Sequence, residues 1–188
     1  TLPNVTYRVY TDKHHTDINE RIILLHGIDG SCSNVALFGG IDSYCTNGLI
    51  RGKYDLVKKK NTSGFNIDSF INELQTAKAD FDAHCKMLQT WAETPIKANV
   101  RLLLDRIVKS ERVSKKMNEL ARQEIAKRGK NMYALYSAFT NYSSYADERN
   151  GFALKNTGND TRGESMWKRE QQVSQWIDSK PFQDLLVA

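Results

Sequence analysis

The hydrophobic pattern of this 188-residue chain changes from a strand-like to a helical period near residue 65. Before that point, β-branched and aromatic runs at 5–10, 21–26, 35–38 and 54–58 are separated by turn residues. Beyond it, apolar residues recur every three or four positions. Because strands precede helices and do not alternate with them, we expect an α+β fold. The predicted architecture is an N-terminal small antiparallel sheet with hairpins, followed by a C-terminal helical region.

Turn residues divide the expected sheet. The segment Gly27–Ser31 is predicted to join two strands as a hairpin, and Asn47–Gly48 is a second turn signal. The pair Gly39–Gly40 is expected to end the strand that begins near Val35.

Capping residues divide the expected helical region. Asn66 or Asp68 is predicted to cap a first helix whose apolar face carries Phe70, Leu74, Ala77, Phe81, Leu88 and Trp91. Thr94 is expected to cap the next helix, with Pro95 at its first position and a stripe of Leu102, Leu103, Leu104, Ile107 and Val108. Gly129 is a stop signal.

The same change in pattern predicts the domain organisation. Residues 1–65 are expected to form the β-rich part of one core, and residues 66–188 a helical part packed on it or extending from it. We expect an upstream segment to be missing, because the chain starts at Thr1 and not at a methionine. No apolar run is long enough for a membrane span, and three irregularly spaced cysteines fit a reduced, cytoplasmic protein.

Positive charge is concentrated in one helical segment. Between Lys97 and Lys130, eleven basic residues face four acids, a net charge of +7 that leaves −2 for the rest of the chain. A segregated basic surface attracts phosphate groups. A solvated helix face with pairs such as Glu111 and Lys115 stays an equal alternative. The predicted basic contacts are Lys58, Lys59, Lys60, Arg101, Arg112, Lys115, Lys116, Arg122, Lys127, Arg128 and Lys130.

Aromatic residues follow the basic segment at helical spacing, at positions 133, 136, 139, 142 and 145. Bases of a single strand stack on exposed aromatics beside a basic groove, so Tyr133 and Tyr136 are candidate stacking residues. The competing interpretation, which the pattern favours, is that this stripe faces the core.

The chain offers no established catalytic pattern. Cys45 with His26 and Asp29 could form a nucleophile pair, but a cysteine within an apolar strand is more often packed than reactive. No spaced carboxylates suggest a two-metal site. We therefore predict no catalytic residue, no metal ligand and no cofactor.

Residues 21–52 carry a resemblance to a known family. The sequences RIILLHGIDGSCSN and GIDSYCTNGLIRG resemble the phage- and plasmid-encoded family called domain of unknown function 932. This chain has His26 where the family commonly has Asn, and Ile28 where His is frequent. The resemblance implies a phage or mobile-element protein and supplies no mechanism. The matching motif residues are Asp29, Gly30, Ser31, Cys45, Asn47 and Gly48.

Charge and resemblance together predict a mobile-element protein that binds DNA, single- or double-stranded, as an accessory in recombination, annealing or replication. The alternative is a protein-interaction or structural module, such as an inhibitor of a host defence system, that binds no nucleic acid. No membrane partner is expected, and the sequence leaves a homo-oligomer open.

Overall fold

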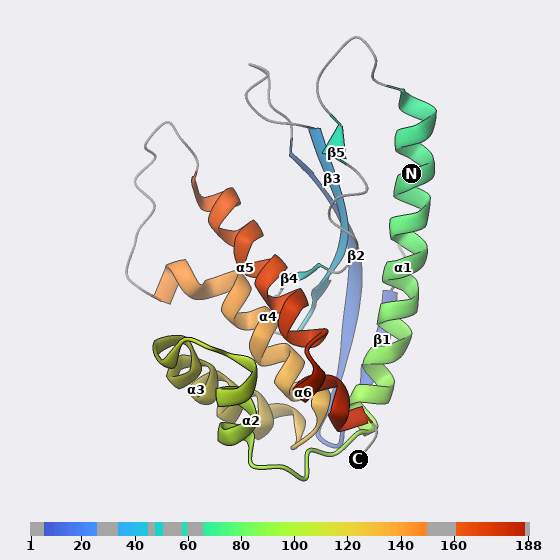
Figure 1. Ribbon diagram of the computed structural model, residues 1–188. Coiled ribbons are helices and arrows are strands. Elements are labelled where there is room, and N and C mark those ends of the chain that lie inside the picture. The colour runs from blue at the N-terminus through green and yellow to red at the C-terminus, as the bar shows by residue number, and fades with distance from the viewer. Residues whose placement is uncertain are drawn as a thin grey trace. The chain divides into compact units, whose positions relative to one another are not determined.

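The predicted fold class is confirmed: an N-terminal antiparallel sheet is followed by a helical region (Figure 1). The computed structural model describes residues 6–25, 34–44, 48–50, 58–59, 66–149 and 161–186. The chain divides into two compact units. Thr1–Arg8 and Asp17–Met87 form the sheet unit, and Val9–Thr16 with Leu88–Ala188 form the helical unit.

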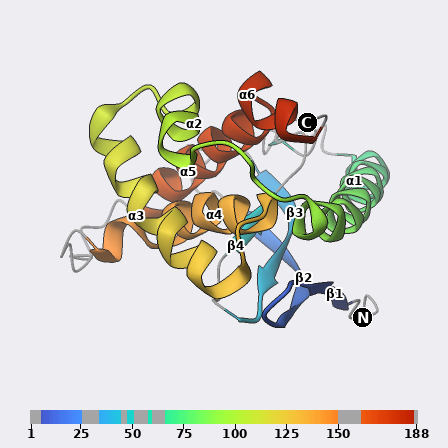
Figure 2. The ribbon, with the colours of Figure 1, turned by 90° about the horizontal axis from the view of Figure 1, so that it is seen from below.

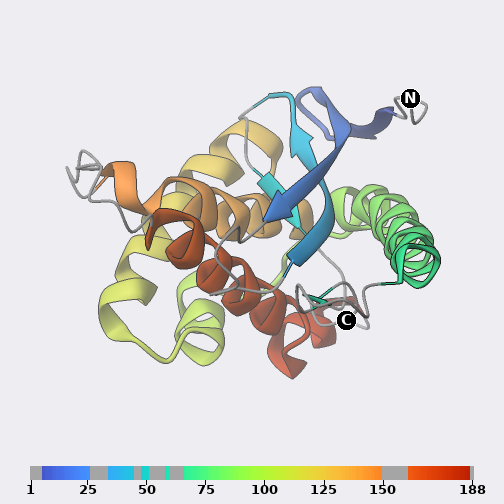
Figure 3. The same ribbon diagram turned by 90° about the horizontal axis from the view of Figure 1, so that it is seen from above.

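The described strands form one sheet in the order β1-β2-β3-β4, with β5 also paired to β3. They can be followed in Figure 1 and, from above, in Figure 3. The predicted hairpin is confirmed, because β2 and β3 pair antiparallel with Leu25 opposite Val35 and Ile18 opposite Asp42. The strands are β1 (Thr6–Tyr10), β2 (His15–Leu25), β3 (Asn34–Asp42), β4 (Gly48–Ile50) and β5 (Lys58–Lys59).

The prediction that Gly39–Gly40 ends a strand is wrong, because β3 continues through both glycines to Asp42. A Cβ atom at Gly40 would lie 2.8 Å from Ile18 Cγ2 and 2.8 Å from Phe81 Cζ. The glycine therefore lets the buried Phe81 side chain approach the strand closely. The turn at Gly27–Ser31 and residues 54–57 lie outside the described residues.

We expect Gly40→Ala to destabilise the protein by about 1–3 kcal/mol, because overpacking displaces its neighbours. Urea unfolding measures this loss. In a Phe81→Leu background the same change should cost less, since the smaller side chain leaves room for the methyl group. An equal loss in both backgrounds would contradict the close-approach explanation.

Helix α1 (Ile67–Glu93) begins as predicted at Asn66, whose side-chain oxygen accepts a hydrogen bond of 3.1 Å from the Ser69 backbone N–H. Within its predicted apolar face, Phe81, Leu88 and Trp91 are buried.

A polar network joins α1 to the strands within the sheet unit. The Tyr7 hydroxyl donates to Asp82 at 2.6 Å, and Lys78 Nζ lies 2.7 Å from Glu20 and 3.3 Å from Asp82. Burial, and then the hydrogen bond to Asp82, raises the pKa of Tyr7. The hydrogen bond to Glu20 raises the pKa of Lys78. Burial opposes ionisation of Asp82, but the bonds from Tyr7 and Lys78 outweigh it and lower the pKa of Asp82.

We expect Tyr7→Phe to cost about 1–2 kcal/mol at neutral pH, because it removes a hydrogen bond to a charged acceptor. A raised folded-state pKa contributes stability that is complete below the ordinary tyrosine pKa of 10.0 and is lost above it. The free energy of unfolding of the native chain should therefore fall above pH 10, and more steeply than that of the variant. Parallel curves would contradict the assigned role of this hydroxyl.

The helical unit is built around α4, because every residue from 131 to 141 is buried. Helix α4 packs against both α3 and α5 (Figure 2). Aromatic rings fill the spaces around it: Trp91 lies edge-on to Tyr136 at 5.2 Å and to Phe182 at 5.3 Å. The helices are α2 (Val100–Ile107), α3 (Glu111–Arg128), α4 (Met132–Arg149), α5 (Thr161–Ile177) and α6 (Lys180–Gln183), with a 3₁₀ turn at Asp184–Leu186.

The predicted helix start at Thr94 and Pro95 is wrong. Helix α2 begins at Val100 and is capped by Asn99, whose side chain accepts from two backbone N–H groups. The segment before it is extended, because the Ile96 N–H donates to Lys130 and the Met132 N–H donates to Thr94. These tertiary hydrogen bonds replace those of a helical turn.

The predicted apolar stripe of α2 is correct at Leu103, Leu104 and Ile107, which are buried, but not at Leu102, which is 63% exposed. The stop at Gly129 is confirmed, since this residue ends α3 with a φ of 89°.

Candidate functional site

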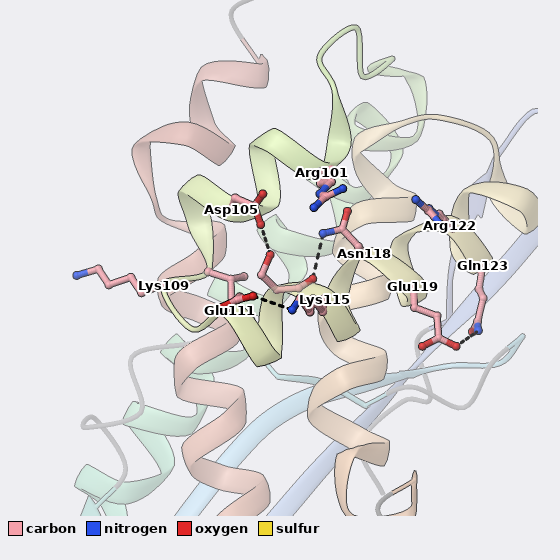
Figure 4. Close-up of a pocket in the computed structure, with 11 residues that line it drawn as sticks. Arg101, Asp105, Lys109, Glu111, Lys115, Asn118, Glu119, Arg122 and Gln123 are labelled. Carbon is pink, nitrogen blue, oxygen red and sulfur yellow. Dashed lines mark hydrogen bonds and ion pairs between the residues drawn. The ribbon is translucent and has the colours of Figure 1, made fainter.

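Helices α2 and α3 border an open hollow of about 660 Å³ within the helical unit (Figure 4). Helix α2 contributes residues four apart, Arg101 and Asp105. Helix α3 contributes Glu111, Lys115, Asn118 and Arg122, whose three- and four-residue spacing places them on one face. The full lining is Arg101, Asp105, Val108, Lys109, Glu111, Ser114, Lys115, Asn118, Glu119, Arg122 and Gln123.

Hydrogen bonds hold the two sides of the hollow together. The buried Ser114 hydroxyl donates to the Asp105 carboxylate and so links α3 to α2. Asn118 Nδ2 donates to the Ser114 carbonyl oxygen at 3.1 Å. The Asp105 carboxylate therefore links the two helices that border the hollow.

Basic and acidic side chains both line the hollow, but only some of the basic side chains are paired with a carboxylate. Lys115 pairs with Glu111 at 2.7 Å, and Glu119 accepts a hydrogen bond from Gln123 at 3.5 Å. Arg101 and Arg122 are exposed and form no ion pair with any residue that the structure describes. The uncompensated positive charge of the hollow is therefore on these two arginines and on Lys109, which is also exposed and forms no ion pair with a described residue.

The predicted basic residues are divided among three environments. Arg101, Lys115 and Arg122 line the hollow. Arg112, Lys116 and Lys127 lie at the spacing of a second face of α3, where Arg112 and Lys127 are exposed and Lys116 is half-buried. Lys127 Nζ lies 3.4 Å from Glu124, and Lys130 is exposed between α3 and α4.

The assignment of Arg128 to a nucleic-acid surface is wrong. Its side chain is 0% exposed and its Nε donates to Glu124 at 2.9 Å. Ser137 of α4 donates to the same carboxylate oxygen at 3.0 Å, and the Arg128 guanidinium lies 5.0 Å from the centre of the Tyr133 ring. A buried charge needs such partners, so Arg128 belongs to the α3–α4 interface.

The assignment of Tyr133 and Tyr136 as stacking residues is also corrected. They are 0% and 1% exposed, and their rings lie 6.3 Å apart inside the helical unit. The competing interpretation, that the stripe faces the core, is therefore correct for both residues.

The remaining predicted residues lie elsewhere or outside the described part. Lys58 and Lys59 form β5 in the sheet unit, and Gly48 begins β4 opposite Ile41. Lys60 and the motif residues Asp29, Gly30, Ser31, Cys45 and Asn47 lie outside the described residues.

Sequence reasoning missed the polar half of the hollow, which comprises Asp105, Lys109, Ser114 and Asn118. A signal for part of it was present, since Glu111, Lys115, Asn118 and Arg122 recur at helical spacing. The Asp105–Ser114 link carried no local signal, because it depends on how two helices pack.

The described residues offer little for other chemistries. Burial raises the pKa of the Cys85 thiol to about 12, so it stays protonated at neutral pH and is a poor nucleophile. No group of three or more His, Cys, Asp or Glu residues within the described ranges could hold a metal ion. Within the same ranges, no helix combines the length and apolar character needed to cross a membrane.

Comparison with known protein families, curated proteins and solved structures gives no match to this chain. The resemblance of residues 21–52 to the phage and plasmid family therefore stays a prediction.

We expect Arg128→Met to lower the free energy of unfolding by about 3–5 kcal/mol, because it leaves the buried Glu124 carboxylate without its main cation. The exposed Arg112→Gln on the same helix should change stability by less than about 0.5 kcal/mol. Adding Glu124→Gln to Arg128→Met should recover part of the loss. Full stability of the single variant in urea unfolding would contradict a structural role for Arg128.

Proposed function

We propose that this protein binds double-stranded DNA through the surface of α2 and α3, by contacts to the phosphate backbone. In this role it would serve as an accessory in recombination or replication of a mobile element, in keeping with the resemblance of residues 21–52. The single observation that carries the proposal is the excess of exposed cations over exposed carboxylates on these two helices.

The net positive charge of residues 97–130 lies at the protein surface. Only Arg128 and Glu124 are buried among its charged side chains, and they cancel each other. Ten basic residues and three acids between Lys97 and Lys130 therefore keep the net charge of +7 in contact with solvent or half-buried. Such a surface releases counterions from a polyanion on binding.

Burial of Tyr133, Tyr136 and Phe139 favours a duplex over a single strand. Single-strand binding needs exposed aromatic rings beside the basic groove, whereas Tyr133 and Tyr136 lie inside the helical unit. Arginine and lysine contacts to phosphates position a protein on a duplex and carry no sequence information directly. The proposed binding is therefore largely independent of sequence.

A protein partner is the second candidate for this surface. Leu102 is 63% exposed beside Arg101, and Glu111 and Glu119 border the hollow. A mixed surface with an exposed apolar side chain suits a protein interface with a polar rim. In this alternative the chain is an interaction module, such as an inhibitor of a host defence enzyme.

We expect the affinity for duplex DNA to fall as salt rises, with a slope of about −3 to −4 on logarithmic axes if four cations each neutralise one phosphate. Replacing Arg101, Lys109, Arg112 and Arg122 together with Gln should weaken binding at low salt by about 100-fold or more and flatten the slope. Fluorescence anisotropy with a labelled duplex measures both quantities.

A control variant, Lys86→Gln with Lys180→Gln, removes two exposed cations outside the segment. It should change affinity by less than about threefold, because neither cation lies on α2 or α3 and Lys180 is already paired with Asp184 at 2.7 Å. If the native chain shows no binding to duplex DNA at low salt, the result contradicts the proposal and favours the protein partner. Unchanged affinity of the quadruple variant contradicts this surface as the binding site.

A further inference from the structure

Two arginines from different helices, Arg101 and Arg122, line the hollow between α2 and α3. Arg101 belongs to the first turn of α2, and Arg122 lies in the second half of α3. Figure 4 shows the Asn118 side chain lying between them in that view. Both arginines line one hollow because α2 and α3 pack against each other, and not because they are neighbours in sequence.

Two other charged groups of the hollow, Lys115 and Asp105, already have partners within the protein. Lys115 is held by Glu111 at 2.7 Å, and the Asp105 carboxylate accepts the Ser114 hydroxyl. Arg101 and Arg122 have no carboxylate partner within the described residues. Lys109 also lacks an ion pair within the described residues, but in Figure 4 its side chain extends away from Asn118 and from both arginines. The two guanidinium groups are therefore the pair of donors beside Asn118 that an outside anion can reach.

Guanidinium chemistry suits a phosphate more closely than a simple positive charge does. An arginine presents a planar set of N–H donors that can bind two phosphate oxygens at once. Two such groups with an amide between them can surround the oxygens of one phosphate or of two adjacent ones. Glu111 and Glu119 border the hollow and would repel phosphates placed away from the arginines.

We propose that Arg101 and Arg122 form a discrete phosphate seat in the hollow between α2 and α3, with Asn118 as its polar partner. The seat rests on the proposed function, to which it adds the residues that hold the backbone phosphate most tightly. The remaining cations, such as Arg106 and Arg112, then contribute only diffuse attraction.

The test compares two double variants with the same change in charge. Arg101→Gln with Arg122→Gln removes both arginines of the seat. Arg106→Gln with Arg112→Gln also removes one exposed arginine from α2 and one from α3, but neither lines the hollow. We expect the first pair to weaken duplex binding on the order of a hundredfold and the second by about threefold. Equal losses in the two double variants would overturn the seat while leaving the proposed function intact.

A second probe separates the seat from DNA binding. Millimolar pyrophosphate should raise the thermal unfolding midpoint of the native chain and of the Arg106/Arg112 variant, but not that of the Arg101/Arg122 variant. This result without duplex binding by the native chain would support the seat for a free phosphorylated ligand and would remove the proposed function. The same response from both variants, or no response from the native chain, would overturn the seat.

Discussion

Burial of α4 on every side between residues 131 and 141 decides which faces of its neighbours meet water. Helix α3 packs on α4 with the face that carries Met117, Ala121 and Glu124. The face that carries Lys115 and Arg122 is consequently left to border the hollow with α2. The proposed phosphate surface thus follows from core packing, because a different rotation of α3 would bury its cations.

The buried pair Glu124–Arg128 restricts this rotation further. Glu124 accepts a hydrogen bond from the Ser137 hydroxyl of α4, and Arg128 lies over the Tyr133 ring of α4. A shift of α3 along α4 would leave a buried charge without its partner. A pair of this kind adds little net stability compared with apolar residues, but its loss on one side is costly. We infer that its contribution lies in fixing the setting of α3, and hence the direction in which Arg122 points.

The sequence was sufficient for the class of fold and for most elements, because strand and helix periods differ and Asn66 and Gly129 act locally. It was insufficient where tertiary contacts decide. Gly40 continues a strand because Phe81 needs its space, and Thr94–Pro95 stays extended because the segment pairs with the α3–α4 connection. Charge counting located the candidate surface, but it could not separate the buried Arg128 from the exposed Arg122, since both are cations on one helix.

We propose that core packing on α4 divides the arginines between Lys97 and Lys130 into exposed residues that bind phosphate and a buried residue, Arg128, that holds α3 on α4. The most direct measurement is an NMR titration of the arginine side-chain Nε–Hε signals with a short DNA duplex. We expect the signals of Arg101 and Arg122 to shift with added duplex, while that of the fully buried Arg128 stays in place. Shifts at Arg128 with none at Arg101 and Arg122 would contradict this proposal.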